Sequence, residues 1–158
     1  MRPTVRIEQS GGDGMRKIRK HLHDVSLEVG ILRGKYKPEG DEPARYVAQV
    51  AAQNEYGHGR IPSRPFMRNA MRKHKKGIRK GLKRVAQSET RAKSANGQMM
   101  RLGMAAQNWV RREITDLRTP PNAPMTIARK RSSNPLIDTG RMRQEIQFRV
   151  MNRSGQTI

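Results

Sequence analysis

The sequence predicts an α+β fold: a small, mostly antiparallel sheet packed by two long helices, with a long proline-rich arm. Two stripes of apolar residues at helical spacing, between Pro65 and Leu117, predict the long helices. Alternating apolar and polar residues near both ends predict the strands, and four prolines within 119–138 predict the arm. We expect one domain over residues 1–151, followed by a polar tail at 152–158.

The first part of the chain is predicted to contain two strands and two short helices. Thr4–Gln9 alternates apolar and polar residues, and Asp24–Leu32 places its valines, Leu27 and Ile31 on one face, so both segments are predicted strands. Asp13 can cap a short helix that reaches His23. Pro43–Asn54 fits a helical period better than strict alternation and predicts the second short helix.

Two long amphipathic helices are predicted in the middle of the chain. Pro65 suits the first helical turn, because no backbone N–H is needed there. The first apolar stripe contains Met67, Met71, His74, Ile78, Leu82 and Val85, and the second contains Met99, Leu102, Ala106, Val110 and Leu117. The polar stretch between them is either helical throughout or broken near Gly97, and the second helix is expected to end before Pro120.

The C-terminal part is predicted to be irregular up to a final strand. Its prolines make 119–138 unsuited to a continuous helix or strand, apart from one helical turn at Met125–Ala128. Asp138 or Thr139 can cap a further turn near Gly140. Beyond it, Ile146, Phe148 and Val150 alternate with polar residues and predict the strand.

The charge of the chain calls for an anionic partner. Its 158 residues carry 34 Lys and Arg against 13 Asp and Glu, a formal net charge of +21, whereas apolar residues make up only 34%. Such a thin core with so much repulsion predicts a monomer of modest stability, which neighbouring subunits or a polyanion could stabilise. The anionic partner could be nucleic acid, an acidic protein surface or a membrane face. The alternative is a charged surface that is exposed to solvent and has no partner.

Ten basic residues lie close together between Arg64 and Arg84 with no acid among them. They are Arg64, Arg68, Arg72, Lys73, Lys75, Lys76, Arg79, Lys80, Lys83 and Arg84. Like charges at helical spacing repel, so we expect this face to meet DNA phosphates or an acidic protein surface, or else to be a solvated outer face. Asn69 and Phe66 are its only residues suited to reading or stacking bases, so sequence-specific recognition is not expected.

No pattern in the sequence predicts an enzyme, a metal site or a cofactor. The chain has no cysteine, which excludes disulfides, thiolate catalysis and zinc–cysteine sites. The pair His21 and His23 lacks a third ligand at useful spacing, and a catalytic pair of His58 and Glu55 has no further support. No apolar run approaches the ~20 residues that span a bilayer, and no signal-peptide core follows Met1, so we expect a soluble, unexported protein without a membrane partner.

Two motif blocks resemble those of tailed-phage neck and tail-completion proteins. The first reads Asn54-Glu55-Tyr56-Gly57, followed by Ile61-Pro62-Ser63-Arg64-Pro65-Phe66-Met67-Arg68. The second reads Pro120-Pro121-Asn122-Ala123-Pro124-Met125-Thr126-Ile127-Ala128-Arg129-Lys130 and leads to Pro135-Leu136-Ile137-Asp138-Thr139-Gly140-Arg141-Met142. Their order and spacing are similar to the family pattern, and together they cover about 46–150. Strong basicity is not part of that pattern.

The resemblance implies a structural virion protein at the head–tail junction, made in the host cytoplasm. Such a protein forms a homo-oligomeric ring, with six or twelve subunits as the expected number. As a tail terminator, tail-completion or neck protein, it joins the tail to the filled head and contacts adjacent neck, connector or tail-tube proteins. Packaged DNA, bound through its phosphates, is a further partner to consider. The family brings no catalytic residues.

The motif residues are expected to divide into two kinds. Those expected to shape the fold are Glu55, Tyr56, Gly57, Pro65, Phe66, Asp138, Thr139 and Gly140. Those expected at the subunit or ring interface are Pro120, Pro121, Asn122, Pro124, Ile127, Arg129, Lys130 and Arg131, because the proline-rich segment is poorly able to form its own core.

Two other function classes remain open from the sequence. A small basic nucleic-acid-binding module that contacts the phosphate backbone is supported by composition, although the motif blocks have no phosphate-binding rationale. A nuclease is supported by charge alone, and the carboxylate clusters that such an enzyme needs are not evident.

Overall fold

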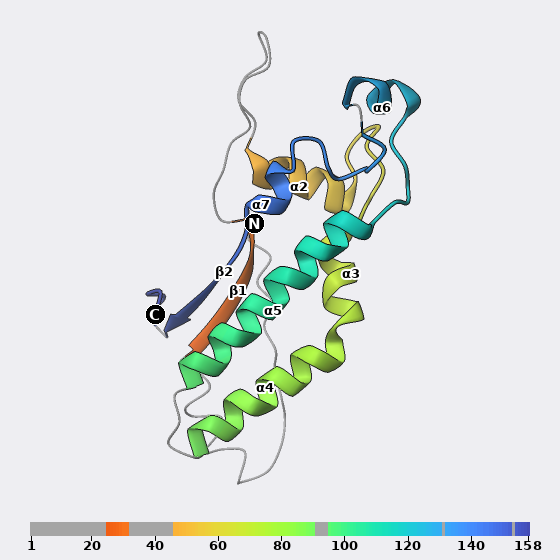
Figure 1. The fold of residues 1–158 in the computed structure, drawn as a ribbon. Coiled ribbons are helices and arrows are strands. Elements are labelled where there is room, and N and C mark those ends of the chain that lie inside the picture. The colour runs from red at the N-terminus through yellow and green to blue at the C-terminus, as the bar shows by residue number, and fades with distance from the viewer. Residues whose placement is uncertain (1–24, 32–45, 91–94, 131, 153) are drawn as a thin grey trace. The chain divides into compact units, whose positions relative to one another are not determined.

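The computed structural model describes residues 25–31, 46–90, 95–130, 132–152 and 154–158, and Figure 1 shows their elements. The predicted α+β class is confirmed. The helices are α2 (Val47–Tyr56), α3 (Phe66–Lys73), α4 (Lys75–Thr90), α5 (Ala95–Asp116), α6 (Pro124–Lys130) and α7 (Arg141–Gln144), and the strands are β1 (Val25–Ile31) and β2 (Ile146–Asn152). The two strands form one antiparallel sheet.

The chain divides into two compact units. The first unit contains the described residues up to Val29, together with Lys75–Ala106 and Phe148–Ile158. The second unit contains the described residues of Gly30–His74, together with Gln107–Gln147. Helix α5 and both strands run from one unit into the other.

Most predicted elements correspond to observed ones. The strands predicted around 24–32 and 146–150 are β1 and β2, and the helix predicted around 43–54 is α2. The predicted single turns are α6 and α7. The strand expected at Thr4–Gln9 and the helix expected up to His23 lie outside the described residues.

The C-terminal tail folds back on the end of β2. The N–H of Ile158 donates to the carbonyl oxygen of Val150 at 3.0 Å, and Met151 and Thr157 form an isolated antiparallel bridge. Gly155 permits this reversal, because its φ of 79° lies in the region that side chains other than glycine's rarely adopt.

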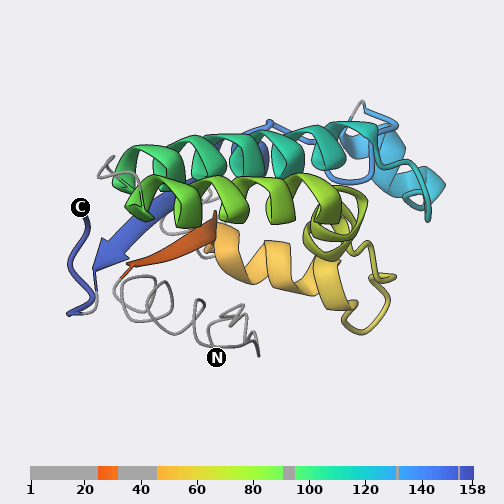
Figure 2. The ribbon, with the colours of Figure 1, turned by 90° about the horizontal axis from the view of Figure 1, so that it is seen from below.

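In the first unit, α4 and the first half of α5 lie side by side (Figure 2). Close packing is possible because Gly81 of α4 faces Leu102 of α5: a Cβ placed on Gly81 would lie 2.6 Å from Leu102 Cδ1. The apolar stripes predicted from the sequence supply the core of this unit. Its buried apolar side chains are Val85, Ala95, Met99, Leu102, Ala106 and Val150.

The prediction of a single helix from Pro65 to Val85 is wrong, because the helix is interrupted at His74. The φ and ψ of His74 are −102° and 16°, and its N–H donates to the Ala70 carbonyl oxygen as α3 ends. Its ring stacks on Trp109, with the ring centroids 4.5 Å apart and the planes 3° from parallel. The stacking contact holds His74 at the break between α3 and α4. The apolar spacing in the sequence continues through His74 and therefore does not indicate the break.

The second unit is built around residues of the two motif blocks. Phe66, expected to shape the fold, is fully buried. Gly57, from the same expected set, has a positive φ of 81°, and a Cβ there would lie 3.1 Å from the backbone nitrogen of Ser63. The other buried apolar residues are Val47, Ala51, Ala70, Val110, Ile114, Leu117, Leu136, Met142 and Ile146.

The expected cap before α7 differs from the prediction. Gly140 occupies the N-cap position with a φ of 76°, and no side chain caps the helix there. Thr139 Oγ1 accepts only a long hydrogen bond of 3.4 Å from the Arg141 N–H. Asp138 does not cap α7, because the left-handed turn at Gly140 already directs the chain into the helix.

Candidate functional site

Arg64 lies at the centre of a buried hydrogen-bond network that joins the two motif blocks. Its Nε donates to the Pro120 carbonyl oxygen at 2.8 Å, and its Nη2 donates to the Pro121 carbonyl oxygen at 2.9 Å and to Asn122 Oδ1 at 3.0 Å. Its Nη1 donates to Asn54 Oδ1 at 3.1 Å. The planar guanidinium group suits this arrangement, because it presents its donors in a fixed fork.

The prediction that Arg64 faces an anionic partner is therefore wrong. Only 3% of the residue is exposed, and its four hydrogen-bond acceptors are neutral oxygens of the same chain. Burial lowers the pKa of Arg64 from its ordinary value, because the charged form loses water. Arg64 stabilises the fold by holding the start of the proline-rich segment against the end of α2.

Glu55, at the end of α2, caps the N-terminus of α3. One carboxylate oxygen accepts the Met67 N–H at 2.9 Å, and the other accepts the Arg68 N–H at 3.1 Å and Arg68 Nε at 3.0 Å. The N-cap residue of α3 is Pro65, whose side chain has no polar atom to cap the helix. Glu55 replaces that missing cap, and its negative charge also suits the positive end of the helix dipole.

Replacing Glu55 by glutamine should lower the free energy of unfolding by about 1–2 kcal/mol. The amide retains one oxygen to accept hydrogen bonds, but it loses the charge and places an NH₂ group against the helix N–H groups. Urea denaturation of the full chain measures the difference. Glu145→Gln is the control, since the Glu145 side chain forms an i,i+4 ion pair with Arg141 and accepts no N–H group of a helix N-terminus. An equal loss in both variants would contradict a specific capping role.

The remaining basic residues of α3 are also held by partners within the second unit. Lys73 Nζ lies 2.6 Å from an oxygen of Glu113, a residue with only 6% of its surface exposed. Arg68 pairs with Glu55, and Arg72 Nη2 donates to Asn69 Oδ1 at 2.9 Å. These contacts give the α3 cations a role in the fold, although their side chains stay partly exposed.

The proline-rich segment is anchored again where it rejoins the core. Asn134 Oδ1 accepts the N–H groups of Leu136 and Ile137 at 2.9 and 3.1 Å, and its Nδ2 donates to the Thr115 carbonyl oxygen at 2.9 Å. Lys130 Nζ donates to the carbonyl oxygens of Asn134 and Pro135 at 3.2 and 3.4 Å.

The contacts of Lys130 change its titration. Burial lowers the pKa of Lys130 from its ordinary 10.5; the charge of Asp138 opposes this effect, and the charges of Arg64 and Arg129 add to it. Lys130 therefore uses its ammonium group for hydrogen bonds within the unit. The carbonyl oxygens of Pro120 and Pro121 and the Asn122 Oδ1 atom are also used within the unit, by Arg64. All four residues were predicted at a subunit interface.

Between these anchors, α6 stands out from the rest of the unit. None of its residues is buried, and it lies beyond the C-terminal end of α5 (Figure 2). Pro124, Ile127 and Arg129 of the predicted interface set belong to α6, whereas Arg131 lies outside the described residues. Met125 was not in that set, yet 85% of it is exposed, more than of any other large apolar residue in the described part. The sequence offered one signal for this exposure. Met125 follows Pro124 at the start of the helix, and the residues three and four positions later, Ala128 and Arg129, do not continue an apolar stripe.

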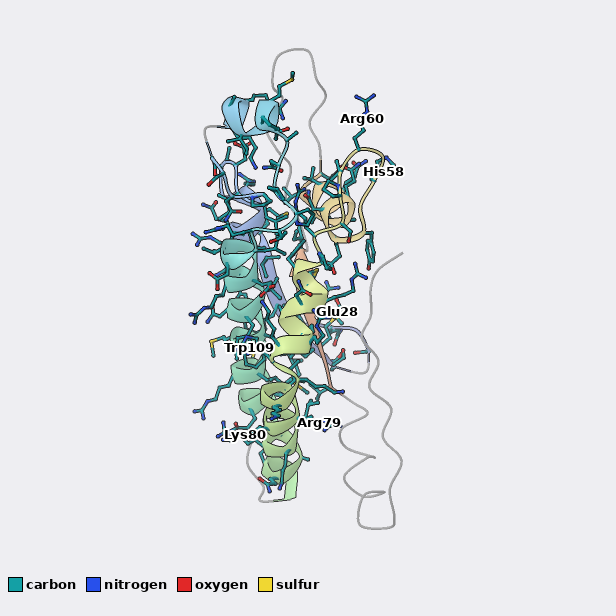
Figure 3. The ribbon with its side chains drawn as sticks, turned by 90° about the vertical axis from the view of Figure 1, so that its right-hand side faces the viewer. Glu28, His58, Arg60, Arg79, Lys80 and Trp109 are labelled. Atoms are coloured by element: carbon teal, nitrogen blue, oxygen red, sulfur yellow. The ribbon has the colours of Figure 1, made fainter. Side chains whose placement is uncertain are left out.

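Helix α4 differs from α3 because its cations have no such partners. Lys75, Lys76, Arg79, Lys80, Lys83 and Arg84 are all exposed. No ion pair or hydrogen bond to these side chains is formed within the described part of the chain. Figure 3 labels Arg79 and Lys80, which project from α4.

Two features of an enzyme site considered from the sequence, a metal cluster and a pair of His58 and Glu55, can be compared with the described residues. In that part of the chain, no three His, Asp or Glu side chains come close enough to hold a metal ion. His58 is exposed in the loop after α2 (Figure 3). The carboxylate of Glu55, its suggested catalytic partner, is occupied by the α3 N-terminus.

No family model, curated protein or solved structure matches the chain. The described helices also include none that is long and apolar enough to cross a bilayer. The features of the chain that bear on its function are therefore the motif blocks, the exposed helix α6 and the exposed cations of α4.

Proposed function

We propose that the chain is a structural protein of the tailed-phage head–tail junction, which assembles as a ring and completes or caps the tail. The observation that carries this proposal is α6: an exposed helix with an outward apolar side chain, held at both ends by buried hydrogen bonds. The motif blocks that resemble the neck and tail-completion family are the same segments that build this support. We assign the chain no catalytic role.

The anchored arm is suited to binding a neighbouring subunit or ring. A segment that is already ordered loses little conformational entropy when it binds, so more of its contact energy remains as affinity. Full burial of a methionine side chain stabilises by about 1.5–3 kcal/mol. In a ring, each subunit would repeat this contact, and the effects would add around the ring.

Replacing Met125 by serine should weaken ring assembly without unfolding the protein. Losing about 2 kcal/mol at each contact corresponds to roughly 30-fold weaker association. Sedimentation velocity across a range of protein concentrations would measure the mass of the wild-type and variant assemblies. This substitution is a sharper test than deleting the arm, because a deletion would also remove acceptors of Arg64 and leave a buried cation unpaired.

Met104→Ser is the matched control, since Met104 is 48% exposed on α5 rather than on the arm. It should assemble as the wild type does. Two results would contradict the proposal: a wild-type chain that stays monomeric at every concentration and is absent from virions, or rings of the Met125 variant that are as stable as those of the control.

A small basic nucleic-acid-binding module is the second candidate function, and the unpartnered α4 cations favour it. The exposed Met125 on α6 would not be needed for nucleic-acid binding by such a module. Unchanged mass and unchanged nucleic-acid binding in Met125→Ser would therefore favour this alternative over ring assembly.

A further inference from the structure

The exposed cations of α4 form two regular rows along one side of the helix. Lys75, Arg79 and Lys83 form one row, and Lys76, Lys80 and Arg84 form the other, each at i, i+4, i+8 spacing. The α4 rows, as we call these six residues, lie opposite the apolar side that includes the buried Val85 and Gly81, which faces Leu102. The side of α4 that packs and the side that carries charge are therefore separate.

Five acids of the described chain pair with cations outside α4. Glu28 pairs with Arg149, Asp116 with Arg112 and Glu145 with Arg141, and the acids that pair with α3 are Glu55 and Glu113. Like charges at i,i+4 spacing destabilise a helix, so the α4 rows weaken the isolated chain. A bound polyanion would remove that penalty.

The composition of the rows favours nucleic acid over an acidic protein surface. Four of the six residues are lysines. Protein–protein interfaces are depleted in lysine and enriched in aromatic residues, methionine and arginine. Phosphate contacts need only a positive charge, whereas base recognition needs side chains such as asparagine or glutamine.

The length of the rows also fits a duplex. From Lys75 to Arg84 the helix rises about 14 Å, at ~1.5 Å for each residue. Each strand of duplex DNA carries one phosphate for every ~3.4 Å of its axis, so about four phosphates of one strand lie along that length. Each row of three cations can therefore follow the phosphates of one strand.

We propose that the α4 rows bind the phosphates of duplex DNA and read no base sequence. This inference goes beyond the proposed assembly function and does not depend on it, because a single chain already presents both rows. In a ring, the same surface would be repeated by each subunit.

The test is a salt titration of binding between the full-length protein and short duplexes of two unrelated sequences. With all six cations engaged, the logarithm of the association constant should fall with the logarithm of the salt concentration at a slope of roughly −5. The triple variant Lys76→Gln, Lys80→Gln, Arg84→Gln should reduce the steepness of this slope by about 2.7, equally for both sequences. Its substitutions are at exposed positions, and circular dichroism would check that it stays folded.

The matched control is the triple variant Arg60→Gln, Arg101→Gln, Arg112→Gln. Each of these arginines is exposed outside α4, and both triple variants remove three charges from the net +21 of the chain. The control should keep a slope close to that of the wild type. Equal losses in both variants would overturn the proposal, because net charge alone would then explain binding. Binding of polyglutamate without binding of the duplex would also overturn it, in favour of an acidic protein partner.

Discussion

Replacing Arg64 by lysine should lower the free energy of unfolding by about 3–5 kcal/mol. The guanidinium group makes four hydrogen bonds to neutral oxygens in a site that is almost closed to water. A lysine ammonium group has three donors on a flexible stem and cannot reach the same set of acceptors. The variant would bury a charge with incomplete hydrogen bonding and leave carbonyl groups of the proline-rich segment unpaired.

Thermal unfolding, together with trypsin sensitivity, would measure the effect of Arg64→Lys. Because the start of the proline-rich segment is bound to Arg64, the variant should be cleaved faster near Arg129 and Lys130 than the wild type. Arg60→Lys is the control: Arg60 is exposed, so its replacement should change stability by no more than about 0.5 kcal/mol. Equal stability of the two variants would refute a structural role for Arg64.

The predictions from sequence succeeded where a periodic pattern determines the structure. The apolar stripe from Met99 to Val110 lies on α5, with Leu117 directly after the helix, and its members are buried in one unit or the other. Pro124 begins the helix predicted within the proline-rich segment, as its fixed φ would favour. These elements follow from local spacing and backbone chemistry, which a sequence displays directly.

The predictions failed where contacts between distant residues decide the outcome. Arg64 looked like one of ten equivalent cations, but its acceptors Pro120, Pro121 and Asn122 lie 56 to 58 residues away in the sequence. The break at His74 depends on stacking against Trp109. Neither contact leaves a local pattern.

The role of Glu55 as the cap of α3 could have been predicted from the sequence but was not. A helix that begins after Pro65 has no side-chain cap of its own, so a nearby acid was a reasonable candidate. Glu55 lies close in the sequence and supplies that cap. The same acid was predicted to shape the fold, but without this capping role; a catalytic pair with His58 was the alternative, because an acid and a histidine that are near in sequence also resemble a proton-transfer pair.

Placing valine at Gly103 should lower the free energy of unfolding by about 3 kcal/mol, roughly a 10 °C fall in the melting temperature. Gly103 is buried on α5 where Phe148 of β2 packs against the helix, and a Cβ there would clash with Phe148 Cδ2. The ring lies directly over the glycine, so either the strand or the ring must move. Gly103→Ala should have the same effect with a smaller magnitude, since it adds one carbon atom rather than three.

Gly97→Ala is the control on the same helix, because a Cβ at Gly97 would meet nothing within 4 Å. It should leave stability unchanged or raise it by up to about 1 kcal/mol, through the better helix propensity of alanine. The double variant Gly103→Ala, Phe148→Ala provides a further test of the cause. If the ring is the obstacle, the double variant should lose less stability than the sum of the two single changes. Strict additivity would show that the cost at Gly103 arises from something other than Phe148.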